Sequence, residues 1–119
     1  MARDAPSIDA YGEGGFRLDG ERHEGSLLIV GDQAQAWSVG SLAELSVEAL
    51  QPVVDAGRAE VEFLLLGLGA RNALPPRAIR EALWAAGMGL EFMDTPSAAR
   101  LYNVLTAEGR RVAAALIAV

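Results

Sequence analysis

The chain has 119 residues, of which 51% are hydrophobic, and carries sixteen acidic residues against ten arginines, for a net charge of −6. It contains no cysteine, no lysine and a single histidine. These counts exclude disulfides, thiol nucleophiles and Schiff-base lysines, and they argue against a histidine-rich metal site and against binding to nucleic-acid phosphates.

One α/β domain over residues 1–119 is what this length and apolar content predict. The first residues lack the apolar core of a signal peptide, and no apolar run approaches the roughly 20 residues that cross a bilayer. We therefore expect a cytoplasmic protein without membrane insertion. The composition gives no indication of a bound metal or cofactor.

The N-terminal third predicts an antiparallel hairpin or meander. Residues 1–15 mix glycine, proline and charge, so we expect a loosely ordered end with a short strand near Ile8. Further strands are predicted at Phe16–Leu18, Glu24–Val30 and Ala34–Trp37, because turn-forming Asp-Gly and Gly-Asp pairs separate them.

A first helix is predicted from Ser46, which can cap the free amides, to a stop at Gly57. Its proline, Pro52, would remove one hydrogen bond from such a helix. Two solutions remain open: either the first turn is irregular, or the helix begins near Gln51.

From residue 60 onward, strands and helices alternate. Glu60–Leu66 is predicted as the central strand, since its apolar run suits burial on both faces. A helix over Pro76–Ala86, a strand over Gly89–Met93, a helix capped by Thr95 and a last strand over Arg111–Val119 follow. This order predicts a three-layer α/β fold, with a mostly parallel central sheet flanked by helices and an N-terminal antiparallel hairpin.

A candidate ligand site lies where these strands should end. Glycines follow the first buried strand, and polar residues surround the start of the last helix; we refer to these six residues as the strand-end cluster: Gly67, Gly69, Asp94, Thr95, Arg100 and Asn103. Clefts in open α/β sheets form at such edges, and this cluster could hold a small anion. The alternative is structural: the glycines make a tight turn, and Arg100 pairs with Asp94 or Glu91.

A candidate interface lies on the predicted helix over residues 76–86. Arg77, Arg80 and Trp84 share one face of this helix, opposite Ile79 and Leu83. A solvent-facing tryptophan flanked by arginines is typical of a protein interface or a self-association surface. The alternative is a tryptophan that lies on a neighbouring loop.

The segment from Leu90 to Ile117 resembles a family of small α/β proteins of unknown function that includes the mitochondrial respiratory complex I assembly factor three and bacterial relatives. The matching pieces are Phe92-Met93-Asp94-Thr95, Arg100-Leu101-Tyr102-Asn103, and Glu108-Gly109-Arg110 before an alanine-rich strand. Leu65–Gly69 and Trp37 also match. The chain departs from the family at Leu68 and Leu101, where threonine is usual.

This resemblance implies a three-layer α/β fold and an assembly role without catalysis. The sequence lacks a nucleophile elbow, and one histidine leaves little room for a catalytic triad. We therefore expect a non-catalytic protein-interaction or assembly-type domain rather than an enzyme. The alternative is a module that binds a small anion or another small ligand, and it could work as an enzyme through the strand-end cluster.

Overall fold

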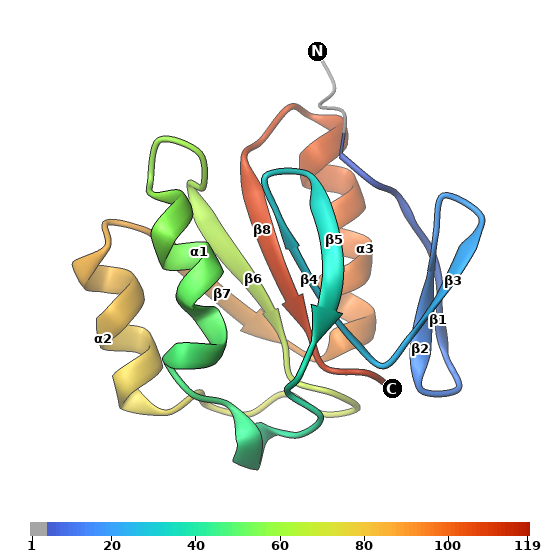
Figure 1. The fold of residues 1–119 in the computed structure, drawn as a ribbon, viewed down its shortest axis with the longest axis horizontal. Coiled ribbons are helices and arrows are strands. Elements are labelled where there is room, and N and C mark those ends of the chain that lie inside the picture. The colour runs from blue at the N-terminus through green and yellow to red at the C-terminus, as the bar shows by residue number, and fades with distance from the viewer. Residues whose placement is uncertain (1–4) are drawn as a thin grey trace.

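Two sheets organise the computed structural model, which describes residues 5–119 (Figure 1). The small sheet has the strand order β1-β2-β3, and the large sheet has the order β5-β4-β8-β6-β7. The strands are β1 (Ile8–Gly12), β2 (Gly15–Leu18), β3 (Glu21–Glu24), β4 (Ser26–Val30), β5 (Gln33–Trp37), β6 (Phe63–Gly67), β7 (Gly89–Met93) and β8 (Val112–Leu116).

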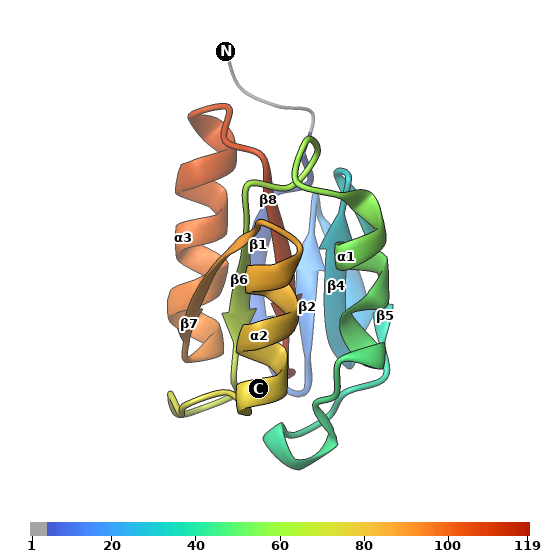
Figure 2. The same ribbon diagram turned by 90° about the vertical axis from the view of Figure 1, so that its left-hand side faces the viewer.

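Helices cover both faces of the large sheet, as predicted. The helices are α1 (Gln51–Ala56), α2 (Arg77–Ala85) and α3 (Thr95–Ala107). In Figure 2, α3 lies to the left of the sheet and α1 to the right. One apolar cluster joins the sheet to α1 and α2, and a second joins its other face to α3 and the small sheet.

The leucine run of β6 lies between these two layers. Leu64, Leu65 and Leu66 are each 0% exposed. Leu64 and Leu66 belong to the cluster on the α1 and α2 side, and Leu65 belongs to the cluster on the α3 side. This alternation is the period of two that a strand imposes, and it confirms the predicted burial of the run on both faces.

The prediction of a mostly parallel sheet is wrong. β6 is parallel to β7 and β8, but β4 pairs antiparallel with both β8 and β5, and the small sheet is antiparallel throughout. Helical crossovers make β6, β7 and β8 parallel, whereas the hairpin of β4 and β5 enters the sheet in the opposite direction. The middle strand of the large sheet is therefore β8, with β6 beside it.

The predicted strand over residues 24–30 is in fact two strands in different sheets. Gly25, at φ 80°, separates β3 from β4, a conformation that glycine adopts without strain. The short strand expected near Ile8 is β1. The loosely ordered end expected over residues 1–15 lies partly outside the described residues, which begin at Ala5.

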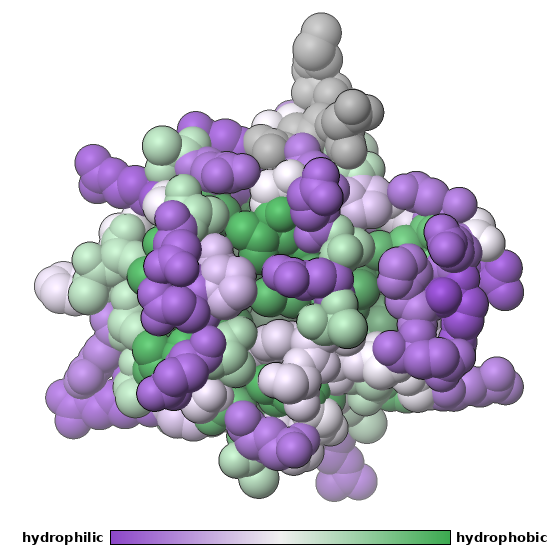
Figure 3. All heavy atoms as spheres, viewed as in Figure 1, coloured by the Kyte–Doolittle hydropathy of each residue, from purple (hydrophilic) through white to green (hydrophobic). Residues whose placement is uncertain are grey.

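The small sheet places its apolar side chains against α3 and its charged side chains toward solvent. Ile8, Phe16 and Leu18 are buried in the cluster with α3. On the outer side, Arg22 forms an ion pair with Glu24 at 2.8 Å. Hydrophilic side chains gather over this sheet at the right of Figure 3. The small sheet is thus a cover for part of the α3 layer.

The region of Pro52 combines the two solutions that the sequence left open. A 3-10 turn at Glu48–Leu50 leads into α1, which begins at Gln51 and has Pro52 in its first turn. The missing N–H of a proline leaves no bond unmade at that position. The Ser46 hydroxyl accepts a hydrogen bond from the Ala49 N–H at 3.2 Å and so satisfies one free amide of the 3-10 turn, although the N-cap position itself is Val47.

Candidate functional site

Thr95 connects the start of α3 to the ends of two strands. Its side chain is fully buried, and its hydroxyl accepts a hydrogen bond from the Gly69 N–H at 2.9 Å and donates one to the Ile117 carbonyl at 2.7 Å. The Thr95 N–H donates to the Gly69 carbonyl at 2.8 Å. The prediction that Thr95 caps the helix is therefore wrong, because its hydroxyl bonds to the segments that follow β6 and β8.

Gly67 lets α3 approach β6 closely. A Cβ at this position would lie 2.9 Å from the Thr95 hydroxyl oxygen and 3.0 Å from the Thr95 Cα. Gly69 has a φ of +93°, which L-residues with side chains rarely adopt. Both glycines thus have a structural reason in the junction between β6 and α3.

Asp94 is the residue that caps α3. Its carboxylate accepts a hydrogen bond from the Ser97 N–H at 2.8 Å and another from the Ser97 hydroxyl at 3.0 Å. These bonds, the backbone one first, hold the pKa of Asp94 below its usual value, and the charge of Arg100 adds a smaller effect in the same direction. Asp94 therefore supplies a negative charge at the positive end of the helix dipole.

Arg100 and Asn103 contact the small sheet. Arg100 Nη1 donates to the Tyr11 hydroxyl at 2.8 Å. The Asn103 side chain accepts from the Ile8 N–H at 2.9 Å and donates to the Ile8 carbonyl at 2.8 Å, as a neighbouring strand would do. Arg100 and Asn103 thus lie on one face of α3, the face turned toward β1.

The strand-end cluster is therefore divided between two places. Thr95 faces Gly69, whereas Asn103 lies eight residues further along the helix, about 12 Å at the usual rise per residue. The hydroxyl of Thr95 and the amide of Asn103 each make two hydrogen bonds to backbone groups of the chain. A ligand-binding role for the cluster stays a prediction.

The outward face of α2 carries the most exposed tryptophan that the structure describes. Trp84 is 83% exposed, whereas Ile79 and Leu83 on the opposite side of the helix are 1% exposed. Arg77 forms an ion pair with Glu81 at 2.7 Å, and Arg80 Nε donates to the Pro75 carbonyl at 3.3 Å. At this exposure the Trp84 ring does not lie on a neighbouring loop.

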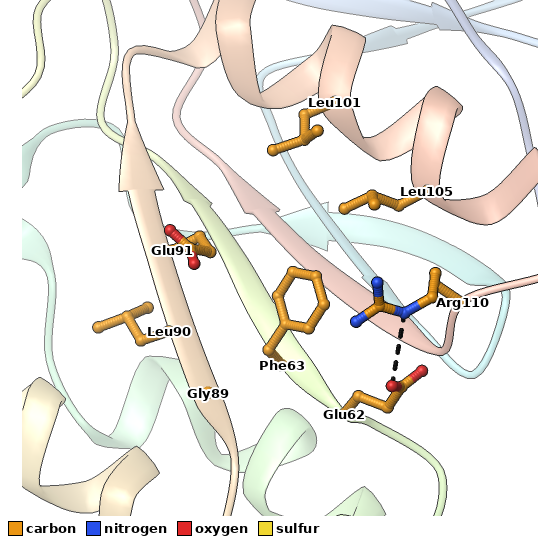
Figure 4. A pocket seen from close by; sticks show the side chains of 8 residues that line it. All are labelled: Glu62, Phe63, Gly89, Leu90, Glu91, Leu101, Leu105 and Arg110. Atoms are coloured by element: carbon orange, nitrogen blue, oxygen red, sulfur yellow. Dashed lines mark ion pairs between the residues drawn. The ribbon is translucent and has the colours of Figure 1, made fainter. Parts of the chain in front are cut away.

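A groove that the sequence did not predict runs between β7 and α3, with a volume of about 500 Å³ (Figure 4). Its lining residues are Glu62, Phe63, Gly89, Leu90, Glu91, Leu101, Leu105 and Arg110. The only signal for it in the sequence is the spacing of Leu101 and Leu105, which places two apolar side chains on one face of a helix. Both side chains are half-buried and border the groove.

Charged side chains border the apolar floor of this groove. The Arg110 guanidinium lies over the Phe63 ring, 5.3 Å from its centroid, and pairs with Glu62 at 3.5 Å. The Arg111 N–H donates to the Glu62 carboxylate at 2.9 Å. This bond first, and the charges of Arg110 and Arg111 with it, hold the pKa of Glu62 below its usual value.

Within residues 5–119, no group of three or more histidine or acidic side chains is arranged to hold a metal ion. In the same part of the chain, no helix has the length and apolar content that crossing a membrane requires.

Comparison with known proteins shows relatives over nearly the whole chain. An uncharacterised protein of Rhodobacter capsulatus is 45% identical over 111 residues, covering 92% of this chain and 82% of that protein. A zebrafish (Danio rerio) protein named NADH dehydrogenase [ubiquinone] 1 alpha subcomplex assembly factor 3 is 34% identical over 110 residues, covering 92% of this chain and 63% of that protein. The chain thus spans less than two thirds of that relative.

A solved structure has nearly the same fold. The crystal structure of an outer membrane protein from Bartonella henselae matches with a TM-score of 0.90 and 32% sequence identity, covering 99% of this chain and 98% of that one. A family model described as a protein of unknown function (DUF498/DUF598) matches residues 8–117. The family resemblance seen in the sequence is confirmed, and the chain belongs to the DUF498/DUF598 family.

Proposed function

We propose that this chain is a non-catalytic protein-interaction domain that acts in the assembly of a multisubunit complex. The observation that carries the proposal is the exposure of Trp84 on the outward face of α2, one turn of the helix after Arg80. The name of the zebrafish relative, an assembly factor for NADH dehydrogenase, favours an assembly role over catalysis. As the sequence predicted, we propose that the protein works in the cytoplasm as one domain.

Trp84 has the properties of an interface anchor. A tryptophan side chain presents about 200 Å² of mostly apolar surface, and truncation of such an anchor at an interface costs about 2 kcal/mol or more in binding. The neighbouring Arg77 and Arg80 side chains offer planar hydrogen-bond donors to a partner. Because Trp84 contributes little to the core, its position on this helix face supports a role in binding.

The test compares Trp84→Ala with Val104→Ala. Val104 is a matched control, because it is also exposed, at 54%, but lies on α3. Each tagged variant is expressed in the organism that naturally makes the protein and is purified from it. Its co-purifying proteins and its sedimentation profile are then compared with those of the wild type. Circular dichroism and urea unfolding report whether each variant is folded.

We expect Trp84→Ala to lose protein partners or self-association while its unfolding midpoint stays unchanged. Val104→Ala should keep both. Unchanged partners and an unchanged sedimentation profile for Trp84→Ala would refute the proposed role of this face.

A further inference from the structure

β7 is an edge strand of the large sheet with little protection against a further strand. Within residues 5–119 it pairs with β6 alone, and Figure 2 looks onto this edge, with β7 in front of β6 between α2 and α3. Its sequence, GLEFM, contains one charge, no proline and no lysine. Edge strands of natural proteins usually carry several charges, lysine in particular, or a proline, because these residues prevent the unpaired backbone groups from binding another chain.

The free backbone groups of β7 belong to Leu90 and Phe92. The Gly89 N–H donates to the Glu62 carbonyl at 3.0 Å, and the Met93 carbonyl accepts from the Leu68 N–H at 2.8 Å. Because alternate residues of a parallel ladder face the same neighbour, Gly89, Glu91 and Met93 bond toward β6. Leu90 and Phe92 therefore direct two donors and two acceptors away from the sheet.

The groove beside this edge has an apolar floor within reach of an added strand. Leu101 and Leu105 point from α3 toward the Phe63 ring, and Arg110 lies beside the ring on the side away from β7 (Figure 4). Phe63 pairs with Gly89, which has no side chain to cover the ring on the edge side. A strand added at about 4.8 Å from β7 could place a side chain over Phe63.

The charge at this edge selects the occupant. Glu91 is exposed, lies two residues beyond Gly89 on the same face of β7, and takes part in no ion pair among the described residues. In an added strand, a basic side chain two positions beyond the apolar residue over Phe63 would lie next to the Glu91 carboxylate. A second copy fits less well, because symmetric antiparallel pairing about the middle of β7 places two Glu91 carboxylates opposite each other.

We propose that β7 binds an extended peptide segment of another protein as an additional strand. The segment carries a bulky apolar residue over Phe63 and, two residues along, a basic residue at Glu91. Backbone hydrogen bonds to Leu90 and Phe92 hold it in place, and the two side chains provide selectivity. This surface is separate from Trp84, so the inference does not rest on the proposed function.

The test titrates the peptide Thr-Val-Phe-Val-Arg-Val-Thr into the ¹⁵N-labelled full chain and follows the amide signals. We expect saturable shifts centred on Leu90 and Phe92, with a Kd below about 1 mM, and slower exchange of these two amides with solvent. Two further peptides carry N-methyl groups on alternate residues, in the two possible phases. Only one set of alternate peptide amides can hydrogen-bond to β7, because the other set points away from the sheet. The peptide methylated on the bonding set should therefore bind about tenfold more weakly or worse, and the other peptide should bind nearly as well as the parent.

The charge-reversal variant Glu91→Arg tests the selectivity. It should bind the parent peptide about tenfold more weakly, and it should prefer a peptide with glutamate in place of arginine. Because Glu91 is exposed, we expect this variant to fold, and its amide spectrum verifies that. Trp84→Ala should leave peptide binding unchanged, which separates this inference from the proposed function.

Several results would overturn the inference. One is that neither the parent peptide nor the glutamate peptide binds. A second is that the two N-methylated peptides bind equally well, and a third is that the amide signals that shift lie around Trp84 instead of β7. A dimer in sedimentation whose protected amides are Leu90 and Phe92, without a response to peptide, would assign the edge to a second copy and would likewise overturn it.

Discussion

Replacement of Thr95 by valine tests whether the junction between β6 and α3 depends on a single hydroxyl. Valine has nearly the same shape, so the packing of the fully buried side chain is retained. The Gly69 N–H and the Ile117 carbonyl would each lose the bond that the hydroxyl makes with them. Both groups lie in buried residues, where water does not readily replace the lost partner.

The expected loss of stability follows from these two orphaned groups. A buried donor or acceptor without its partner costs about 1–3 kcal/mol, so the two orphaned groups in Thr95→Val should destabilise the protein by about 2–6 kcal/mol. Thr95→Ser keeps the hydroxyl and removes one methyl group, which should cost about 1 kcal/mol. Against a typical total stability of about 5–15 kcal/mol, the two variants should be easily distinguished.

Urea unfolding monitored by circular dichroism measures this difference. With a slope of about 2 kcal/mol per molar urea, the midpoint should fall by about 1–3 M for Thr95→Val and by about 0.5 M for Thr95→Ser. Amide exchange of Gly69 should accelerate in the valine variant only. If both variants have the same midpoint, or if the Gly69 amide stays protected in the valine variant, the assigned role of the hydroxyl is wrong.

Four further predictions concern α3 and the segments that pack against it. Gly67→Ala should cost about 1–3 kcal/mol by urea unfolding, because its Cβ would press on the backbone of Thr95; a neutral effect would contradict this. Asn103→Ala should speed amide exchange at Ile8 and leave the centre of α3 protected, whereas unchanged exchange would show that the side-chain bonds are dispensable. The lowered pKa of Asp94 means that its charge stabilises the fold above the usual carboxyl pKa and that this stabilisation is lost as the pH falls through the lowered value. The gap in urea midpoint between wild type and Asp94→Asn should therefore shrink as the pH falls below about 4, the usual pKa of an aspartate, and a constant gap would refute the assignment. If the strand-end cluster binds small anions, millimolar phosphate should raise Tm by about 2–5 °C, and an unchanged Tm would count against that prediction.

Local patterns in the sequence predicted the parts of the fold that local physics determines. The uninterrupted run of Leu64 to Leu66 indicated burial on both faces, and it is buried on both. Helical crossovers indicated that β6, β7 and β8 are parallel, and they are. In each case the signal lies within a few tens of residues, where periodicity and crossover handedness apply.

The pairing of β4 with β8 had no such signal. Leu28 lies opposite Ala115, 87 positions further along the chain, and nothing near either residue specifies the partner or its direction. The break at Gly25 had no local signal either. A glycine can also lie within a single strand, so the sequence did not indicate that β3 and β4 belong to different sheets. Tertiary packing determined both outcomes.

The start of α3 shows how a shift of one residue changes a functional interpretation. Asp94 and Thr95 are both good capping residues, so the sequence could not decide between them. Once Asp94 takes the cap, Thr95 enters the first turn and its hydroxyl turns to Gly69 and Ile117. A residue predicted at the mouth of a cleft is thereby placed in a buried junction.

These contacts explain why the two proposed binding surfaces lie away from the strand-end cluster. α3 is attached at its start through Thr95 and further along through Asn103, so its polar groups already have partners that a ligand would have to displace. The backbone groups of Leu90 and Phe92 and the indole of Trp84 need no such exchange, because a partner would replace only water. α2 and β7 are neighbours in the fold, so one protein could contact both the helix face and the strand edge. Binding at either surface would then raise the effective concentration at the other, and loss of one should weaken that partner without abolishing its binding.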